Sequence, residues 1–183
     1  MMKFLYLLIG VLAINVCNSQ TSQDHILWHE SRKLTINDFA IKNSLTAGSG
    51  SFAQFSMNYQ LKGFDVFTKN FNKKVENRMI GSASWLDTTS NVSQALLYQQ
   101  TLFDLSEIYT RKFRKALKEE RKRLIKNLKL AEDLNDNIMT EFSKRRLEYS
   151  QDTNFGLDST RQMLWQNSIK SELSDLAQFA YDK

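Results

Sequence analysis

The spacing of apolar residues changes once along this chain, near residue 93, and the change indicates two kinds of secondary structure. Before it, apolar and polar residues alternate, as in residues 51–61, where Phe55, Met57 and Tyr59 recur at every second position. Such alternation is typical of strands with one buried face. After it, apolar residues recur at helical spacing, and the 183 residues contain no proline to interrupt a helix. We therefore expect an α+β fold, with an N-terminal antiparallel sheet followed by about three helices.

The helical part divides into three predicted helices. The first runs from about residue 93 to residue 134, and its basic stretch within residues 115–134 is expected to be a solvated face. The second covers residues 136–150. The third covers residues 160–181, and Asp158 or Ser159 should cap it. The apolar residues of the third helix that should face inward are Met163, Leu164, Ile169, Leu173 and Leu176.

The N-terminal residues are expected to direct the chain out of the cytoplasm. Lys3 precedes an apolar run, and the small residues around Ser19 suit a cleavage site, so a secretory signal peptide is predicted over residues 1–19. A polar leader should follow over residues 20–24, and a single domain over residues 25–183. The apolar run is short for a transmembrane anchor. We therefore expect an exported protein, located in the periplasm or outside the cell.

Cys17 is the one cysteine of the chain. A lipid anchor on Cys17, which would attach the protein to the outer membrane, is an alternative that the bulky Val16 disfavours. Removal of the signal peptide would leave no cysteine, and therefore neither a disulfide nor a catalytic thiol. The 25 Lys and Arg residues exceed the 20 Asp and Glu residues only slightly, and no basic stripe interleaves with aromatic residues. A nucleic-acid-binding protein is therefore not expected.

Residues 95–113, ALLYQQTLFDLSEIYTRKF, contain a spacing that other proteins use to bind zinc. Residues four apart lie on one face of a helix. Two histidines at this spacing can bind a zinc ion, while a glutamate that follows the first histidine activates the metal-bound water. In this chain Tyr98 and Leu102 have that spacing, and Gln99 follows Tyr98.

Through this helix and several other segments, the chain resembles a bacterial family of predicted secreted zinc-dependent proteases. The family is formally a domain of unknown function, and its members carry a His-Glu-Gln-x-His-Phe-Asp helix. The similar segments are LTINDF (residues 34–39), SWLD (84–87), FDLSEIYTRKF (103–113) and YSQDTNFG (149–156), followed by Gln162 and Trp165. The resemblance extends from about residue 26 to the C-terminus. It implies a zincin-like arrangement and a zinc ion held by two residues of the helix and one near residue 155.

The residues at the expected zinc-ligand positions differ from those of the family. Tyr98 and Leu102 stand at two histidine positions, Phe155 stands at the third, and Gln99 replaces the glutamate base. Leucine and phenylalanine offer no lone pair to a metal, and an amide does not take a proton from water near neutral pH. We therefore expect no metal, no other cofactor and no catalytic residue, with Tyr98, Leu102 and Phe155 packed together as a small apolar plug. The alternative is an open, aromatic-lined cleft that still binds a ligand.

Three carboxylates remain as candidates for binding or residual chemistry. Asp104 should cap a helix, pair with Arg111 or face solvent, Glu107 lies on the same helix, and Asp152 would approach Asp104 if its loop returned to the helix. The first hypothesis is a non-catalytic binding protein, or pseudoenzyme, for an unknown peptide or envelope protein. The second is a hydrolase or peptidase with a displaced or metal-independent site built from these carboxylates. The third is a diverged relative with little function.

Overall fold

The computed structural model describes residues 24–42, 50–62, 64–127 and 129–183. The expected signal peptide, Cys17 and nearly all of the expected polar leader lie outside these residues. In the described part of the chain, no helix combines the length and the apolar character that crossing a bilayer requires.

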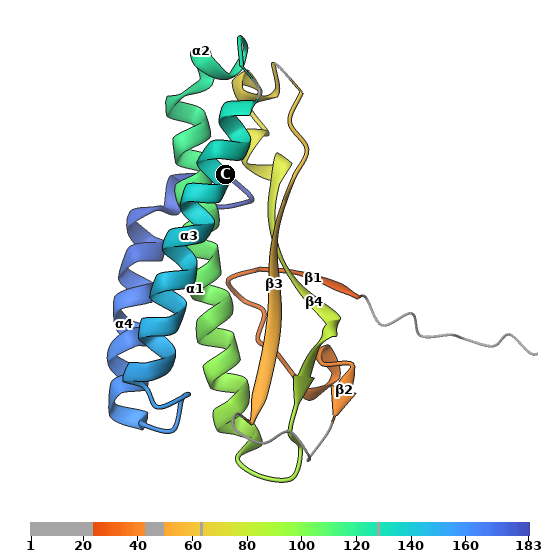
Figure 1. Ribbon diagram of the computed structural model, residues 1–183, viewed down its shortest axis with the longest axis vertical. Helices are drawn as coiled ribbons and strands as arrows, with labels where there is room; N and C mark the ends of the chain where they lie inside the picture. The colour runs from red at the N-terminus through yellow and green to blue at the C-terminus, as the bar shows by residue number, and fades with distance from the viewer. Residues whose placement is uncertain (1–23, 43–49, 63, 128) are drawn as a thin grey trace, which may run out of the picture.

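The described residues form an α+β fold, with a sheet on one side and helices on the other (Figure 1). The long strand β4 (Val75–Leu86) pairs along one edge with β3 (Ser51–Tyr59) and along the other with β1 (His25–Leu27). Both pairings are antiparallel, which confirms the predicted fold class. A short strand, β2 (Ile41–Lys42), pairs parallel with the end of β4 because the chain reverses direction between β1 and β2. This parallel pair was not predicted.

An irregularity in β4 lies opposite the first residues of β3. Phe52 pairs with Trp85 but Gln54 pairs with Ile80, so extra residues of β4 bulge between the two pairs. The Ser84 hydroxyl bridges the gap in the ladder. Its Oγ accepts a hydrogen bond from the Gln54 N–H (3.0 Å) and donates one to the Ile80 carbonyl (2.5 Å). These bonds keep β3 attached to β4 up to its first residue.

Helices make up the rest of the described fold. The α-helices are α1 (Val92–Glu119), α2 (Arg121–Leu124), α3 (Lys129–Asp152) and α4 (Ser159–Asp175). The 3-10 turns are η1 (Ile36–Asp38), η2 (Asp65–Phe67), η3 (Phe71–Lys74) and η4 (Ala177–Phe179). One side of α1 packs on β3 and β4, and its other side packs on α3 and α4 (Figure 1). This central position explains why so much of α1 is buried.

The first helix is shorter than predicted, since it ends at Glu119 instead of near residue 134. Leu117 before the break and Leu124 after it are both buried, so apolar spacing alone does not reveal the interruption. The sequence nevertheless contains one local indication of a new helix, because Asn127 is a residue type that favours helix starts. The Asn127 Oδ1 accepts a hydrogen bond from the Lys129 N–H (3.1 Å), as a residue that starts a helix does.

The last helix begins where the sequence predicted but turns a different face to the core. The Asp158 side chain caps α4 by accepting a hydrogen bond from an N–H of its first turn (2.9 Å). Met163 and Leu164, expected to face inward, are 55% and 53% exposed, whereas Ile169 is buried as expected. The buried position in the first turn belongs to Gln162. A polar residue therefore occupies the place for which the pattern favoured apolar ones.

Two apolar clusters lie along α1. The larger, toward the start of α1, includes Phe39, Met79, Leu102, Leu105, Ile108, Tyr149 and Ile169. The smaller, toward its end, consists of Phe71, Val75, Phe113, Leu117, Leu124 and Ala131. The same helix thus anchors the core and carries the residues for which the resemblance implied a metal site.

Candidate functional site

The two helix positions expected to hold zinc ligands lie on the buried face of α1. Tyr98 is 6% exposed and Leu102 is 1% exposed, and Leu102 packs within the larger apolar cluster. The spacing therefore placed them correctly on one face of a helix. Both side chains are enclosed by other parts of the protein.

Tyr98 is held by stacking and by a hydrogen bond. Its ring stacks on the Tyr149 ring at 5.2 Å between centroids, with the planes 14° apart. Its hydroxyl lies 2.6 Å from the Ser150 Oγ, and since the Ser150 hydroxyl donates to the Arg146 carbonyl (2.8 Å), Tyr98 is the donor. Burial raises the pKa of the Tyr98 hydroxyl above its usual value. A protonated, hydrogen-bonded phenol of this kind is a poor metal ligand.

The loop after α3 lies against the start of α1, as the plug hypothesis required. The Gln94 Nε2 donates a hydrogen bond to the Gly156 carbonyl (2.6 Å). A Cβ atom added to Gly156 would lie 2.7 Å from the Tyr98 Cβ, well inside van der Waals contact. Only a residue without a side chain fits between this loop and the Tyr98 ring.

Phe155 does not join Tyr98 and Leu102, so the expectation of a three-residue apolar plug was wrong. The Phe155 side chain is 51% exposed. Its backbone is left-handed (φ 55°), and its N–H bonds to the Ser150 carbonyl (2.7 Å) where α3 ends. This conformation turns Phe155 outward, and Gly156 takes the place against Tyr98. The outcome is closer to the alternative, an open cleft with an aromatic residue at its wall.

Gln99, at the position of the family's glutamate base, joins α1 to the first residue of β3. It is 1% exposed, and its Nε2 donates a hydrogen bond to the Ser51 Oγ (2.9 Å). The Gln99 Oε1 is also buried and has no hydrogen-bond partner among the described residues. The amide acts here as a link between a helix and a strand.

A chain of buried hydrogen bonds links α1, α3 and α4 next to Tyr98. The Tyr149 hydroxyl donates to the Gln162 Oε1 (2.6 Å), and the Gln162 Nε2 donates to the Thr101 Oγ1 (2.8 Å). Thr101 in turn donates to the Leu97 carbonyl (2.9 Å). From the sequence, Gln162 was singled out only through the resemblance, and Thr101 and Ser150 were not predicted. The signal in the sequence that could have indicated these hydrogen bonds was the presence of polar residues on the otherwise apolar face of a predicted helix.

The residues at the expected ligand positions do not fit a zinc ion. The Tyr98 oxygen is protonated and already bonded, Leu102 has no donor atom, and Phe155 turns away from both. A catalytic zinc site needs three protein ligands and an open position. Within the described residues, no group of three His, Cys, Asp or Glu side chains gathers at a distance suited to a metal.

Asp104 is hydrogen-bonded to Trp28 and Gln100, whereas Arg111 pairs with Glu107. The Asp104 Oδ1 accepts hydrogen bonds from the Trp28 Nε1 (2.8 Å) and the Gln100 Nε2 (2.9 Å). The Gln100 Oε1 accepts a further bond from the Leu34 N–H (2.8 Å). Burial raises the pKa of the Asp104 carboxyl, and the two donors only partly oppose this effect. The carboxylate therefore holds the segment after β1 against α1.

The other two carboxylates belong to separate clusters. The buried Glu107 Oε1 contacts Arg114 (2.8 Å) and Arg111 (3.1 Å). The Asp152 Oδ2 accepts a hydrogen bond from the Trp165 Nε1 (2.8 Å) at the exposed edge between α3 and α4. Asp104, Glu107 and Asp152 thus have three different sets of partners, and no carboxylate pair forms between Asp104 and Asp152 in the described structure.

A cleft of about 440 Å³ opens at the start of α1, between the first residue of β3 and the loop after α3. Its walls combine polar and apolar groups. They are formed by Gly50, Ser51, Asp87, Ser90, Asn91, Gln94, Ala95, Asn154, Phe155 and Leu157. We call this hollow the α1 cleft. Gln94 holds one of its walls, and Ser51 connects it to the buried Gln99.

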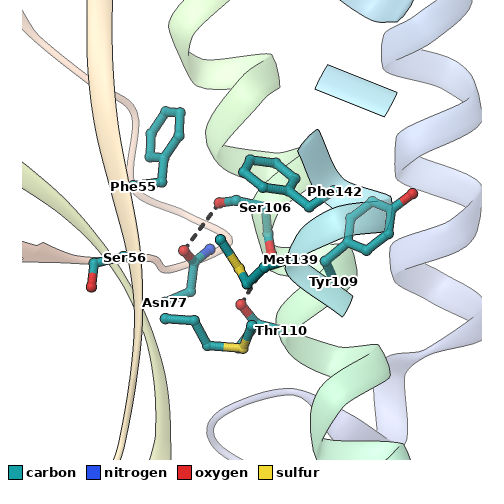
Figure 2. Close-up of a pocket in the computed structure, with 9 residues that line it drawn as sticks. Phe55, Ser56, Asn77, Ser106, Tyr109, Thr110, Met139 and Phe142 are labelled. Atoms are coloured by element: carbon teal, nitrogen blue, oxygen red, sulfur yellow. Dashed lines mark hydrogen bonds between the residues drawn. The ribbon is translucent and has the colours of Figure 1, made fainter. Parts of the chain in front are cut away.

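A second hollow, between the sheet and the middle of α1 and α3, is too small to be a ligand site. Figure 2 shows the residues around it, including the hydrogen bond that the Ser106 Oγ donates to the Asn77 Oδ1 (3.0 Å). Its volume is about 10 Å³, near the least that one water needs. Phe55 and Phe142 line it with Met139. It is a packing gap of the core, which leaves the α1 cleft as the better candidate.

Comparison with known proteins identifies no relative. No protein-family model, no curated protein and no solved structure matches this chain. The likeness to secreted zinc-dependent proteases therefore remains a hypothesis from the residues quoted above.

Proposed function

We propose that this chain is an exported, non-catalytic binding protein with a zinc-protease-like fold. Its ligand would be an extended peptide or a segment of an envelope protein, held in the α1 cleft. One observation carries the proposal. The positions where the family would bind zinc hold a hydrogen-bonded Tyr98 and a buried Leu102, while the cleft beside them stays open.

The composition of the α1 cleft favours a peptide as its ligand. Asn91, Gln94 and Asn154 supply amide groups of the kind that pair with peptide backbone. Phe155 and Leu157, 51% and 57% exposed, supply apolar surface for a side chain. Binding sites commonly pair an apolar surface with a few placed polar groups. Phe155, whose backbone is fixed by the end of α3, is the residue expected to contribute most.

The positions of the carboxylates favour this proposal over a displaced hydrolytic site. A metal-independent hydrolase would need Asp104, Glu107 or Asp152 to act on one substrate. Glu107 is buried between two arginines, Asp104 is bonded to Trp28, and Asp152 lies at the α3–α4 edge. None of the three lines the α1 cleft.

Peptide selection followed by a matched pair of substitutions tests the proposal. Peptides selected from a random displayed library on the protein beginning at Gln20 are labelled, and their Kd is measured by fluorescence anisotropy. Phe155→Ala should weaken binding about tenfold. Phe67→Ala is the control, since Phe67 is 49% exposed and lies near the other end of α1. Selected peptides that bind Phe155→Ala as tightly as the parent would count against the proposal.

Two further measurements separate binding from catalysis. Zinc content after mild dialysis should be far below one ion per chain, and the selected peptides should survive incubation intact. A stoichiometric zinc ion would refute the proposed loss of the metal site. Peptide cleavage that persists in chelator and disappears in Asp104→Asn would favour the hydrolase instead.

A further inference from the structure

Positive charge is concentrated at the end of the molecule where α1 terminates. The described residues of two segments meet there, namely residues 61, 62 and 64–74 with η2 and η3, and residues 115–127 and 129 with α2 (Figure 1). Together they contain eleven Lys and Arg residues and three acidic residues, a net charge of +8. The whole chain has a net charge of +5, so all remaining residues together carry −3. We call the surface formed by these two segments the basic tip.

Apolar side chains stand exposed among these charges. Phe64 is 74% exposed, Phe67 is 49% exposed, and Ile125 is 40% exposed. The Arg121 guanidinium lies 5.9 Å from the centre of the Phe67 ring, which places the two segments in contact. Phe64 is the most exposed large apolar residue of the described chain. Large apolar groups that stay in water amid a charged surface mark an interaction site.

Most of the basic side chains of the tip have no acidic partner. Lys74 lies near Asp65 (3.8 Å), Lys115 lies near Glu119 (3.9 Å), and Arg123 pairs with Glu120. Seven lysines make no ion pair with the described residues, namely Lys62, Lys69, Lys73, Lys118, Lys122, Lys126 and Lys129. Their charge is therefore available to an external anion.

A hollow of about 130 Å³ lies within this surface. Lys69 and Lys118 border it, together with Thr68 and Gln178. Two ammonium groups beside a side-chain amide suit a phosphate group. The basic tip thus offers a place for an anionic headgroup in addition to its diffuse charge.

We propose that the basic tip binds the surface of a bilayer that contains anionic phospholipid. Phe64, Phe67 and Ile125 enter the headgroup region, and the lysines contact the phosphates around them. Apolar side chains flanked by lysines are the combination that peripheral membrane segments use.

Two features favour a lipid surface over a nucleic acid. Nine of the eleven basic residues are lysines, which act as hydrated point charges, whereas recognition of nucleic acids relies heavily on arginine. Ile125 also has no π face on which a base can stack. Its aliphatic side chain, like Phe64, gains free energy from contact with acyl chains instead.

Vesicle binding tests the proposal on the protein beginning at Gln20, which retains every described residue. The probes are vesicles of phosphatidylcholine alone and of phosphatidylcholine mixed with phosphatidylglycerol, in a flotation assay. The protein should bind only the mixed vesicles, and added salt should release it. Failure to bind the mixed vesicles at low ionic strength overturns the proposal.

Matched variants locate the binding surface. Each lysine near an anionic surface contributes about fivefold to partitioning, so Lys122→Glu with Lys126→Glu should reduce it by at least about thirtyfold. Phe64→Ala with Phe67→Ala should reduce it about tenfold. The control Lys144→Glu with Lys170→Glu changes charge equally on exposed positions of α3 and α4 and should have a much smaller effect. Equal losses in both charge variants would contradict a localised site.

A fluorescence measurement and a nucleic-acid arm complete the test. Subtracting the parent spectrum from that of Phe64→Trp gives the emission of the introduced tryptophan. This emission should shift to shorter wavelength with the mixed vesicles and remain unchanged with neutral ones. A labelled oligonucleotide should bind the parent more weakly than the mixed vesicles do, and Phe64→Ala should leave that weak binding unchanged. Tighter binding to the oligonucleotide, or no such shift when the Phe64→Trp variant is bound to vesicles, overturns the proposal in favour of another anionic partner.

Discussion

Gly156 decides how the loop after α3 meets α1. Its φ of 84° is a conformation that glycine adopts readily, and its missing side chain leaves room for the Tyr98 ring. Phe155, one residue earlier, takes a left-handed backbone at some cost and faces outward. The resemblance to the protease family predicted that this loop approaches the helix. It did not predict that the glycine, and not the aromatic residue, would fill the contact.

Substituting Gly156→Ala should lower the free energy of unfolding by about 2 kcal/mol or more, because the new methyl group meets Tyr98 in a strained backbone. Gly50→Ala is the control. Its Cβ would have no described atom within 4 Å, so stability should change by less than about 0.5 kcal/mol. Urea unfolding of both variants measures the difference. Equal effects of the two substitutions would mean that the loop does not pack on Tyr98.

Asp104→Asn should change how stability depends on pH. Burial raises the folded-state pKa of Asp104 above its unfolded value of about 3.9, so its contribution to stability is greatest at low pH and falls as the carboxyl ionises. Asparagine does not ionise but can still accept from Trp28. The stability of Asp104→Asn relative to the parent should therefore rise from about pH 4 toward neutral pH. Urea midpoints at a series of pH values measure this, and a constant difference would contradict it.

At the scale of secondary structure, the sequence predicted which elements exist better than where they end or which face they bury. The strand β3, the presence of a long first helix and the Asp158 cap follow from local patterns and were confirmed. The break after Glu119 was missed because apolar spacing continues across it. The buried face of α4 was partly wrong because Gln162 is stabilised in the core by partners distant in sequence. Such partners are set by tertiary packing and not by local spacing.

A buried ion network joins α1 to the sheet and to the C-terminal segment. The Arg114 side chain donates hydrogen bonds to the carbonyls of Val75 and Phe179 as well as to Glu107. Arg111 donates to Glu107 and to the Leu173 carbonyl. Among the described residues, Glu107 is thus the acidic partner shared by the two buried arginines, which gives it a structural reason for its place on the helix.

Glu107→Gln should cost about 3–5 kcal/mol of stability, since it leaves Arg111 and Arg114 buried without a compensating charge. Glu119→Gln is the same chemical change at a side chain that is 65% exposed and 3.9 Å from Lys115, and should cost less than about 0.5 kcal/mol. Thermal or urea unfolding gives both values. A cost for Glu107→Gln as small as that of the control would show that the network contributes little.

At the scale of the whole molecule, its two candidate surfaces lie at opposite ends of α1. The α1 cleft includes Gln94 near the start of the helix, and the basic tip includes Arg121 just beyond its end. From its sequence, the basic run was expected to be a solvated face, as most such charge runs are. Folding brings Phe67 beside that run from a segment about fifty residues away. This juxtaposition is a property of the tertiary fold and has no local signature.

The two surfaces should act independently. Phe155→Ala should leave vesicle binding unchanged, and Lys122→Glu with Lys126→Glu should leave the affinity for a selected neutral peptide unchanged, because sites this far apart with no shared side chain usually behave additively. Measuring each variant in both assays, and the peptide affinity with vesicles present, checks this. A peptide affinity that changes on vesicles would reveal coupling between the ends.

The unbroken length of α1 has a geometric consequence. Its 28 residues at about 1.5 Å each separate its two ends by about 40 Å. A molecule that rests on a lipid surface by one end would hold its opposite end well above the headgroups, out in the aqueous space. The length of this helix then sets how far the α1 cleft lies from that surface.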